Sequence, residues 1–393
     1  MDTTKTSFGF EVARYLAETI GIRFSGTPSE ERAAAYVAQQ FRSLGYPVEE
    51  EKFQFLGWDI TAPAQLTILN PTCRDVPVNP FIWSDSTPPG GVEGIVKRAG
   101  RMNIIELFEW DKFVIVDPQT EEPLAYFAAR DDGITVSMAQ ASSTFTFPVV
   151  TVGKEDFEEL KRMELSGEEI RARLQVHTKF KPGTRSRNII AKLPGKESEK
   201  GVVLCAHYDS QYNTPGAYDN ASSVGLLLEV ASQLRQRSFR RPIYFISFGA
   251  EEYLWVGAAY HIKSLKEQNL LGRYFAAVNV DAILIPDQRD SLLGGSVVHH
   301  TDDSLELDRR VRRIIDAEKV PGFYNITYET PPSPSSDHAP FVREGIPAVK
   351  LFDAAPYWFH TPNDTFEKID FNSWDYSRCC AQRLVEELAD LPD

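Results

Sequence analysis

Histidine and carboxylate side chains stand where short apolar runs end between residues 202 and 252. The residues concerned are His207, Asp219, Glu251 and Glu252. Apolar runs of this length, rich in β-branched and aromatic residues, are typical of buried strands in a parallel sheet. Because open α/β sheets bind ligands at the carboxyl ends of their strands, we expect these side chains to converge. Imidazole and carboxylate groups that converge are suited to holding zinc.

The acidic residues at these strand ends also need a positive partner. They are Asp209, Asp219, Glu251, Glu252 and, after a later apolar run, Asp281. An ionised carboxylate is costly to bury unless it is paired, so a buried cluster of them needs cations nearby. A carboxylate that uses both oxygens can bridge two metal ions ~3.5 to 4 Å apart. The cluster therefore predicts a metal centre at the strand ends.

Glu251 and Glu252 are adjacent, and adjacent side chains point in different directions. One of them can bind a metal ion while the other stands off and accepts a proton from the attacking water. The alternative is a solvent-facing pair in a loop, which the apolar run at 243–248 disfavours. Asp209, two residues beyond His207, is placed to orient that imidazole, although an aspartate in an ordinary turn would look the same.

The first part of the chain is typical of helices. Thr27, Pro28 and Glu30 have the spacing of a capping box at the start of a helix. Apolar residues follow at helical spacing through 34–44, and Gly45 supplies a left-handed stop. We therefore predict a helix that begins near residue 28 and ends before Gly45.

The rest of the chain contains two segments with different predicted secondary structure. Residues 65–180 contain short β-like pieces separated by Pro and Gly clusters, with one helix at 156–163. From residue 187 onward strands and helices alternate, which predicts a mostly parallel sheet flanked by helices. The expected strands there are 188–193, 202–206, 243–248, 275–280 and 347–352, and the expected helices are 221–234, 258–266 and 305–318. We expect residues 1–64 and 181–393 to form one domain, with 65–180 inserted into it.

Composition limits the partners of the chain. Its 393 residues are 42% hydrophobic, which is enough for a large core and two domains. Acidic residues outnumber basic ones 56 to 42, and the net charge of −14 disfavours nucleic acid and anionic membrane surfaces as partners. No basic start with an apolar stretch and no run near ~18 apolar residues is visible. We expect a cytoplasmic protein, although a secreted protein without its leader would look the same.

A series of motifs resembles those of the co-catalytic di-zinc aminopeptidases. That superfamily also includes glutamate carboxypeptidases, aminopeptidase Y and the single-zinc glutaminyl cyclases. The motifs are His207-x-Asp209, residues 216–224, Glu251-Glu252, residues 279–281, 336–341, 345–348 and 360–364. The resemblance covers roughly 10–60 and 185–385 and implies a three-layer α/β/α domain with a mixed, mostly parallel sheet. Residues 65–180 resemble the protease-associated domain that some members insert, most closely at 147–152 and the helix after it.

The resemblance implies a role for each site residue. The implied ligands are Asp219 bridging two zinc ions, His207 and Asp281 in one site, and Glu252 and His360 in the other. Glu251 would be the general base, and a cis peptide would follow the bridging aspartate, here at Asp219–Asn220. Manganese or cobalt could substitute for zinc, which is preferred on ligand type alone. The residue that stabilises the oxyanion is left open among His338, Tyr357 and Tyr328.

We predict hydrolysis of peptides from the amino end. A free amine can bind beside metal ions and acidic groups, whereas a substrate carboxylate would need a cation there. The nearest basic residues, Arg343 and Lys350, are expected to face solvent. A carboxypeptidase-type exopeptidase stays an alternative, as does a glutaminyl cyclase, which the presence of both His207 and Asp281 disfavours. A receptor-like binding module without metals is disfavoured because every ligand is intact.

Overall fold

The computed structural model describes most of the chain and divides it into two compact units. The first unit contains Met1–Gln54, Arg185–Ala355 and Pro362–Asp393, and the second contains Phe55–Thr184 and Pro356–Thr361. The residues described are 6–105, 108–130, 133, 135–140, 146–283, 294–297, 307, 309–311, 313–314, 317, 335–352 and 356–392.

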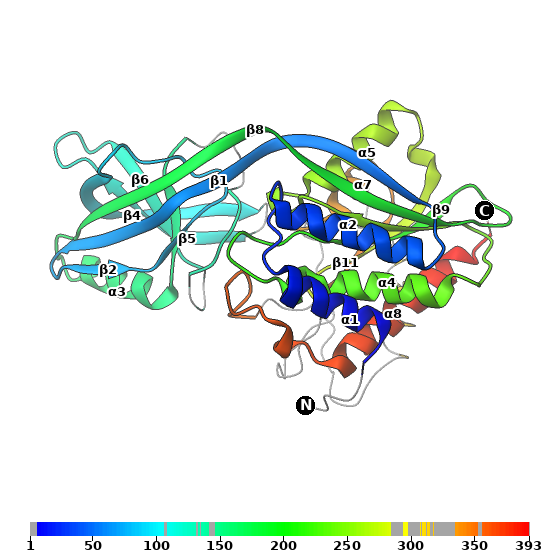
Figure 1. The fold of residues 1–393 in the computed structure, drawn as a ribbon. Coiled ribbons are helices and arrows are strands. Elements are labelled where there is room, and N and C mark those ends of the chain that lie inside the picture. Colours follow the sequence, from blue (N-terminus) through cyan, green and yellow to red (C-terminus); the bar gives the residue numbers. More distant parts are fainter. Residues whose placement is uncertain are drawn as a thin grey trace. The chain divides into compact units, whose positions relative to one another are not determined.

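The first unit is built on a mixed, mostly parallel sheet (Figure 1). Its strands lie in the order β12-β13-β11-β9-β10-β8, and β1 pairs with β8. Their bounds are β1 Val48–Asn70, β8 Arg171–Leu193, β9 Gly201–His207, β10 Ile243–Phe248, β11 Tyr274–Val280, β12 Gly294–Val297 and β13 Ala348–Phe352. The pairs β10–β9, β9–β11 and β11–β13 are parallel, whereas β8 and β12 run antiparallel to β10 and β13. The predicted α/β class is confirmed.

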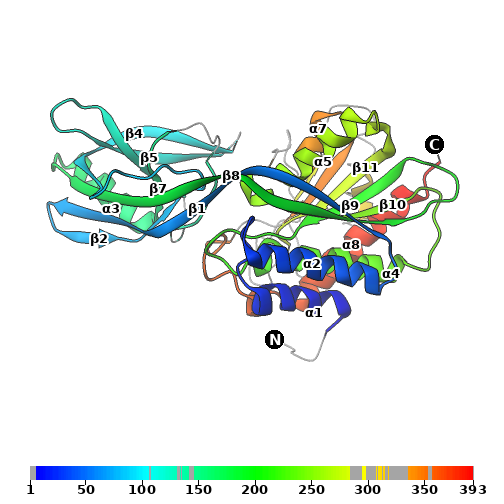
Figure 2. The same cartoon turned by 45° about the horizontal axis from the view of Figure 1, so that its top comes forward.

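Helices cover both faces of this sheet (Figure 2). The α-helices are α1 Phe8–Arg14, α2 Pro28–Ser43, α4 Ser222–Leu234, α5 Val256–Glu267, α7 His338–Arg343 and α8 Phe371–Ala389. Short helical turns are η1 Tyr15–Ile20, η2 Ala217–Ala221, η3 Glu251–Tyr253, η4 Leu271–Arg273 and η5 Phe366–Lys368. Helices α1, α2, α4 and α8 lie on one face, and α5 and α7 lie on the other. The first unit therefore has the three layers that the resemblance implied.

The central strands are buried on both faces. Every residue of β9 and of β10 is buried. On one face, Cys205 and Ile246 pack with Ala258 and Ile262 of α5. Strands covered on both faces are near-continuous apolar runs, and for this reason their positions could be predicted from sequence.

Helix α2 begins where predicted, but Glu30 has a different partner from the one expected. The Thr27 side chain caps the helix by accepting the Glu30 N–H at 3.3 Å, and Gly45 has the left-handed φ of +89° that ends it. The Glu30 carboxylate does not return to Thr27. It is buried: one oxygen accepts hydrogen bonds from Tyr208 Oη at 2.8 Å and from Ser186 Oγ, and the other accepts the Gly26 N–H at 3.2 Å, one residue before the cap. This half of the predicted capping box is therefore wrong.

Glu30 is expected to make stability depend on pH. Burial raises its pKa from 4.5 to about 7, against the opposing hydrogen bonds from Ser186 and Tyr208. The folded state then holds a proton that the unfolded chain releases near pH 4.5, so stability falls as pH rises from ~4.5 to ~7 and no further above. The free energy of unfolding of Glu30→Gln, measured by chemical denaturation, should rise relative to that of wild type by about 3 kcal/mol between pH 4 and pH 8. A stability difference that stays constant over this pH range would contradict the assignment.

The second unit is rich in β-strands. Its strands lie in the order β8-β4-β5-β6-β7-β3, and β2 pairs with β1. The bounds are β2 Arg74–Val76, β3 Val78–Pro80, β4 Val92–Ile105, β5 Phe108–Val116, β6 Pro123–Ala128 and β7 Val149–Val152, with helix α3 at Lys154–Leu165. Phe113, Phe127 and Phe157 contribute to its core. The β-like pieces and the helix predicted in this segment are confirmed.

The limits of the second unit differ from residues 65 and 180 expected from the sequence. Strands β1 and β8 are each long enough to belong partly to one unit and partly to the other. The short segment Pro356–Thr361 also groups with the second unit, far along the chain from the rest of it.

Two predictions concern residues that are only partly described. The helix expected at 305–318 is described at 307, 309–311, 313–314 and 317, and these positions are helical. Tyr328, a candidate for oxyanion stabilisation, lies outside the described residues. Among the helices of the described part, none combines the length and the apolar character needed to cross a membrane.

Candidate metal centre

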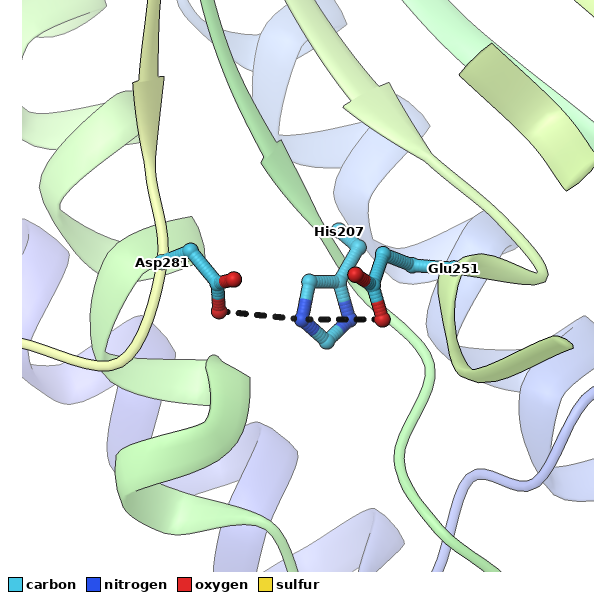
Figure 3. A group of neighbouring side chains, drawn as sticks. All are labelled: His207, Glu251 and Asp281. Atoms are coloured by element: carbon cyan, nitrogen blue, oxygen red, sulfur yellow. Dashed lines mark hydrogen bonds and ion pairs between the residues drawn. The ribbon is translucent and has the colours of Figure 1, made fainter. Parts of the chain in front are cut away.

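Three of the predicted site residues come from the ends of neighbouring strands (Figure 3). His207 is the last residue of β9, Asp281 directly follows β11, and Glu251 lies three residues beyond β10. The register pairs Cys205 with Asn279, so His207 and Asp281 lie level with each other two residues further along. The structure thus brings together side chains that the strand ends were predicted to bring together.

Carboxylates surround the His207 imidazole. Its Nε2 lies 3.0 Å from Asp219 Oδ1, 3.4 Å from Asp281 Oδ1 and 3.9 Å from Glu251 Oε2. One atom each from His207, Glu251 and Asp281 lies within 4.8 Å of the other two, and these side chains are buried. Ligands ~2.0 to 2.2 Å from one zinc ion lie ~3 to 4 Å from each other. The distances between these ligand atoms are therefore compatible with binding of a single metal ion.

An irregular turn before α4 positions Asp219. Within η2 the backbone is non-helical at Asp219 and Asn220, and the peptide between them is cis, as the resemblance implied. The Asp364 carboxylate accepts the backbone N–H of Tyr218 at 2.7 Å and of Asp219 at 3.1 Å. A buried carboxylate from a distant part of the sequence thus fixes the backbone that directs Asp219 toward His207.

Asp209 connects the elements of the site. One of its oxygens lies 3.4 Å from His207 Nδ1 and accepts the Glu251 N–H at 3.2 Å. Its other oxygen accepts the Glu252 N–H at 3.2 Å and the Ser25 Oγ–H at 2.8 Å. Asp209 is therefore placed to hold both the imidazole and the backbone of the two glutamates, in keeping with the orienting role predicted for it.

The backbone beside two site residues is strained. Ala250, just before Glu251, has φ of +58°, and Ala282, just after Asp281, has φ of +57°. Positive φ in residues other than glycine costs energy and is concentrated at functional sites. Gly249 is needed for a separate reason, because a Cβ there would lie 2.4 Å from Ser186 Oγ.

Sequence reasoning missed two polar residues that shape the site. Gln211 is buried and donates from Nε2 to Glu252 Oε2 at 2.7 Å. The guanidinium of Arg23 is buried and donates to the carbonyls of Tyr208 and Gly216, both at 2.9 Å. Burial lowers the pKa of Arg23 to about 10. No pattern in the sequence relates Arg23 to a loop almost 200 residues away, whereas Gln211 follows the His207-x-Asp209 motif closely enough to have been considered.

Burial and crowding of like charges shift the proton affinities of the site. Burial raises the pKa of Glu251 well above its usual value, and the carboxylates of Asp281 and Asp219 add to the effect. The pKa of Glu252 is raised for the same reason. Burial alone would lower the pKa of His207, but the surrounding carboxylates, Glu251 foremost, raise it well above its usual value.

Lys350 was expected to face solvent, and this prediction is wrong. The residue is 7% exposed and its Nζ lies 3.0 Å from Asp281 Oδ2. Burial would lower the pKa of Lys350, but Asp281 outweighs burial and raises it. Burial would likewise raise the pKa of Asp281, but Lys350 and His207 hold it far below its usual range. Arg343, by contrast, is exposed as predicted.

The remaining candidates lie in different surroundings. His338 is fully buried at the first turn of α7, directly after the buried Asp337. Tyr357 is 61% exposed in the second unit, where its carbonyl accepts from Arg130. His360 also belongs to the second unit, and its Nδ1 lies 2.9 Å from the carbonyl oxygen of Ser137. The roles predicted for His338, Tyr357 and His360 stay predictions.

The donor set around His207 fits zinc. One imidazole nitrogen and several carboxylate oxygens, buried together, are ligands that zinc binds in proteins. Burial and repulsion between carboxylates raise the pKa of Glu251 and Glu252, and a divalent cation would offset both effects. The same donor set would accept manganese or cobalt.

Residues 188–382 match the model of peptidase family M28. The chain carries a peptidase domain of family M28. Aminopeptidase YwaD of Bacillus subtilis is 26% identical over 390 residues, which cover 93% of this chain and 81% of the relative. The solved peptidase M28 precursor of Shewanella amazonensis has a TM-score of 0.79 at 17% identity, covering 99% of this chain and 94% of that one. BSAP, a zinc aminopeptidase from Bacillus subtilis, has a TM-score of 0.72 at 22% identity, covering 98% and 95%.

The M28 match includes every predicted ligand, from His207 to His360. The two solved structures share the fold of this chain. The predicted family, a peptidase with an α/β fold, is thereby confirmed.

Proposed function

We propose that this M28 peptidase is a zinc aminopeptidase that removes the amino-terminal residue of peptides. The observation that carries the proposal is the buried group of His207, Glu251 and Asp281 at the strand ends, inside the M28 match. The names of its relatives YwaD and BSAP support aminopeptidase activity, and the name of BSAP supports zinc.

The proposed centre holds two metal ions. Its ligands are Asp219 as the bridge, His207 and Asp281 in the first half, and Glu252 and His360 in the second half. The 3.0 Å separation of His207 and Asp219 supports their sharing an ion. The assignment of His360 rests on the motif at 360–364, because this residue belongs to the second unit.

Zinc ions bound there would polarise the scissile carbonyl and acidify the attacking water. In the proposed reaction Glu251 removes a proton from that water as its oxygen attacks the carbonyl carbon, and then delivers the proton to the leaving amine as the C–N bond breaks. Glu251 Oε2 lies 3.9 Å from His207 Nε2, within reach of a water bound beside that ligand, which supports both steps. Asp209 keeps His207 and the Glu251 backbone in position.

The acidic surroundings support binding of a substrate amine. Asp209, Asp219, Glu251 and Asp281 all lie within 4 Å of His207. Lys350, a cation in direct contact with this group, is already paired with Asp281, which disfavours a second role for it in holding a substrate carboxylate.

We further propose that the second unit is a protease-associated domain. Its β-rich core, with β7 followed directly by α3, supports the resemblance stated for residues 147–163.

A panel of matched peptides tests the proposed function. Tripeptides with a free amino end should be cleaved whether the carboxyl end is free or amidated, and amino-acetylated versions should be resistant. A chelator should abolish cleavage and added zinc should restore it. Cleavage of acetylated peptides alone, or dependence on a free carboxyl end, would overturn the aminopeptidase assignment. Loss of ammonia from peptides that begin with Gln, without hydrolysis, would instead indicate a glutaminyl cyclase.

A further inference from the structure

Lys350 lies beside one half of the proposed centre. It is on β13, which pairs in parallel with β11, and the register places it opposite Asn279. Its side chain extends to Asp281, two residues further along, where Nζ lies 3.0 Å from Oδ2. The Lys350 side chain is 9% exposed and that of Asp281 is 8% exposed. Water therefore screens this ion pair little.

The two oxygens of Asp281 have different partners. Oδ1 lies 3.4 Å from His207 Nε2, whereas Oδ2 is held by the Lys350 ammonium. Asp281 can therefore offer one oxygen to an ion bound at His207, while the other oxygen neutralises a fixed positive charge.

In the other half of the proposed centre, a neutral side chain donates to the ligand Glu252. Glu252 Oε2 accepts a hydrogen bond at 2.7 Å from the side-chain amide of Gln211, which carries no charge. An ammonium beside a ligand repels an arriving divalent cation and draws charge from the carboxylate, whereas an amide only orients it. Asp281 Oδ2 therefore has an ammonium in direct contact, whereas the donor to Glu252 Oε2 is neutral.

We propose that Lys350 is a built-in counter-charge that makes the His207–Asp281 half the weaker, later-filled half of the metal centre. The proposal rests on the binuclear centre proposed above. It assigns Lys350 as a positioning residue that acts through Asp281, and it predicts that occupancy of this half follows the zinc supply while the Glu252 half stays filled.

Zinc affinity measured by competition tests the proposal. Metal-free wild type, Lys350→Met, Lys350→Arg and the exposed control Arg343→Met are titrated with zinc against chromophoric chelators of graded strength, and zinc per chain is measured by elemental analysis. Wild type should bind one ion tightly and one weakly. Lys350→Met should tighten the weak ion by about tenfold or more and leave the tight ion unchanged. Lys350→Arg, which keeps the charge, and Arg343→Met should behave as wild type.

Thermal unfolding with and without zinc shows whether the Lys350→Met variant is correctly folded. Lys350→Met removes the partner of Asp281, so its melting temperature should depend more on zinc than that of wild type. The inference would be overturned if wild type bound both zinc ions with equal affinity, or if Lys350→Met bound the weaker ion with unchanged affinity or not at all. This holds even if wild type cleaves peptides with a free amino end. A wild type with no zinc-dependent cleavage would overturn the proposed function instead.

Discussion

Replacing Glu251 with Gln is expected to lower kcat by about 10²- to 10⁴-fold and to leave the zinc content unchanged. Gln keeps the size and the hydrogen-bonding oxygen of Glu, but it cannot take a proton from water. The backbone N–H of residue 251 still reaches Asp209, so the turn at η3 should be kept. Steady-state kinetics with a free-amine peptide, beside elemental analysis of zinc, measures both quantities.

The neighbouring glutamate supplies the matched control. Glu252→Gln is the same chemical change one residue along, at a proposed ligand, and should reduce zinc content as well as activity. The comparison is informative because Glu251 lies close enough to His207 and Asp281 to bind an ion itself. A Glu251→Gln variant that loses zinc as Glu252→Gln does would make Glu251 a ligand, and near-normal turnover would remove it from the reaction.

The strand ends could be predicted because of how the sheet is buried. Strands β9, β10 and β11 are covered on both faces, so their sequences are near-continuous apolar runs whose ends are easy to locate. A polar residue at such an end is easily noticed, and parallel pairing in register then brings His207 and Asp281 together. The closeness of these side chains therefore follows from where the two strands end, once β9 and β11 are paired.

The side-chain partners of Glu30 and Lys350 could not be predicted from the sequence in the same way. Glu30 has the spacing of a capping residue, yet tertiary contacts with Ser186 and Tyr208 turn its carboxylate inward. Lys350 was assigned to solvent because lysine is rarely buried. A usable signal was present, since a lysine inside a predicted buried strand must find a carboxylate, and Asp281 follows another predicted strand. That the two strands are neighbours was not visible in the sequence.

Asp219→Asn is expected to remove most of the bound zinc, whereas Asp281→Asn should remove only the weaker ion. A bridging carboxylate serves both ions with two oxygens and a negative charge. Asparagine offers one oxygen and no charge, so its introduction at a bridge should weaken both halves together. Asp281 serves the His207 half alone, and without its charge the Lys350 ammonium there is left unbalanced.

Zinc per chain after dialysis against a weak chelator separates the two variants. Wild type should retain about two ions, Asp281→Asn about one and Asp219→Asn well below one, with activity lost in Asp219→Asn. Asp75→Asn, the same change at an exposed position, controls for the substitution itself. Thermal unfolding of the metal-free forms shows whether the fold survives. If both variants lose the same amount of zinc, Asp219 does not bridge, and the centre holds its ions in separate sites or holds only one.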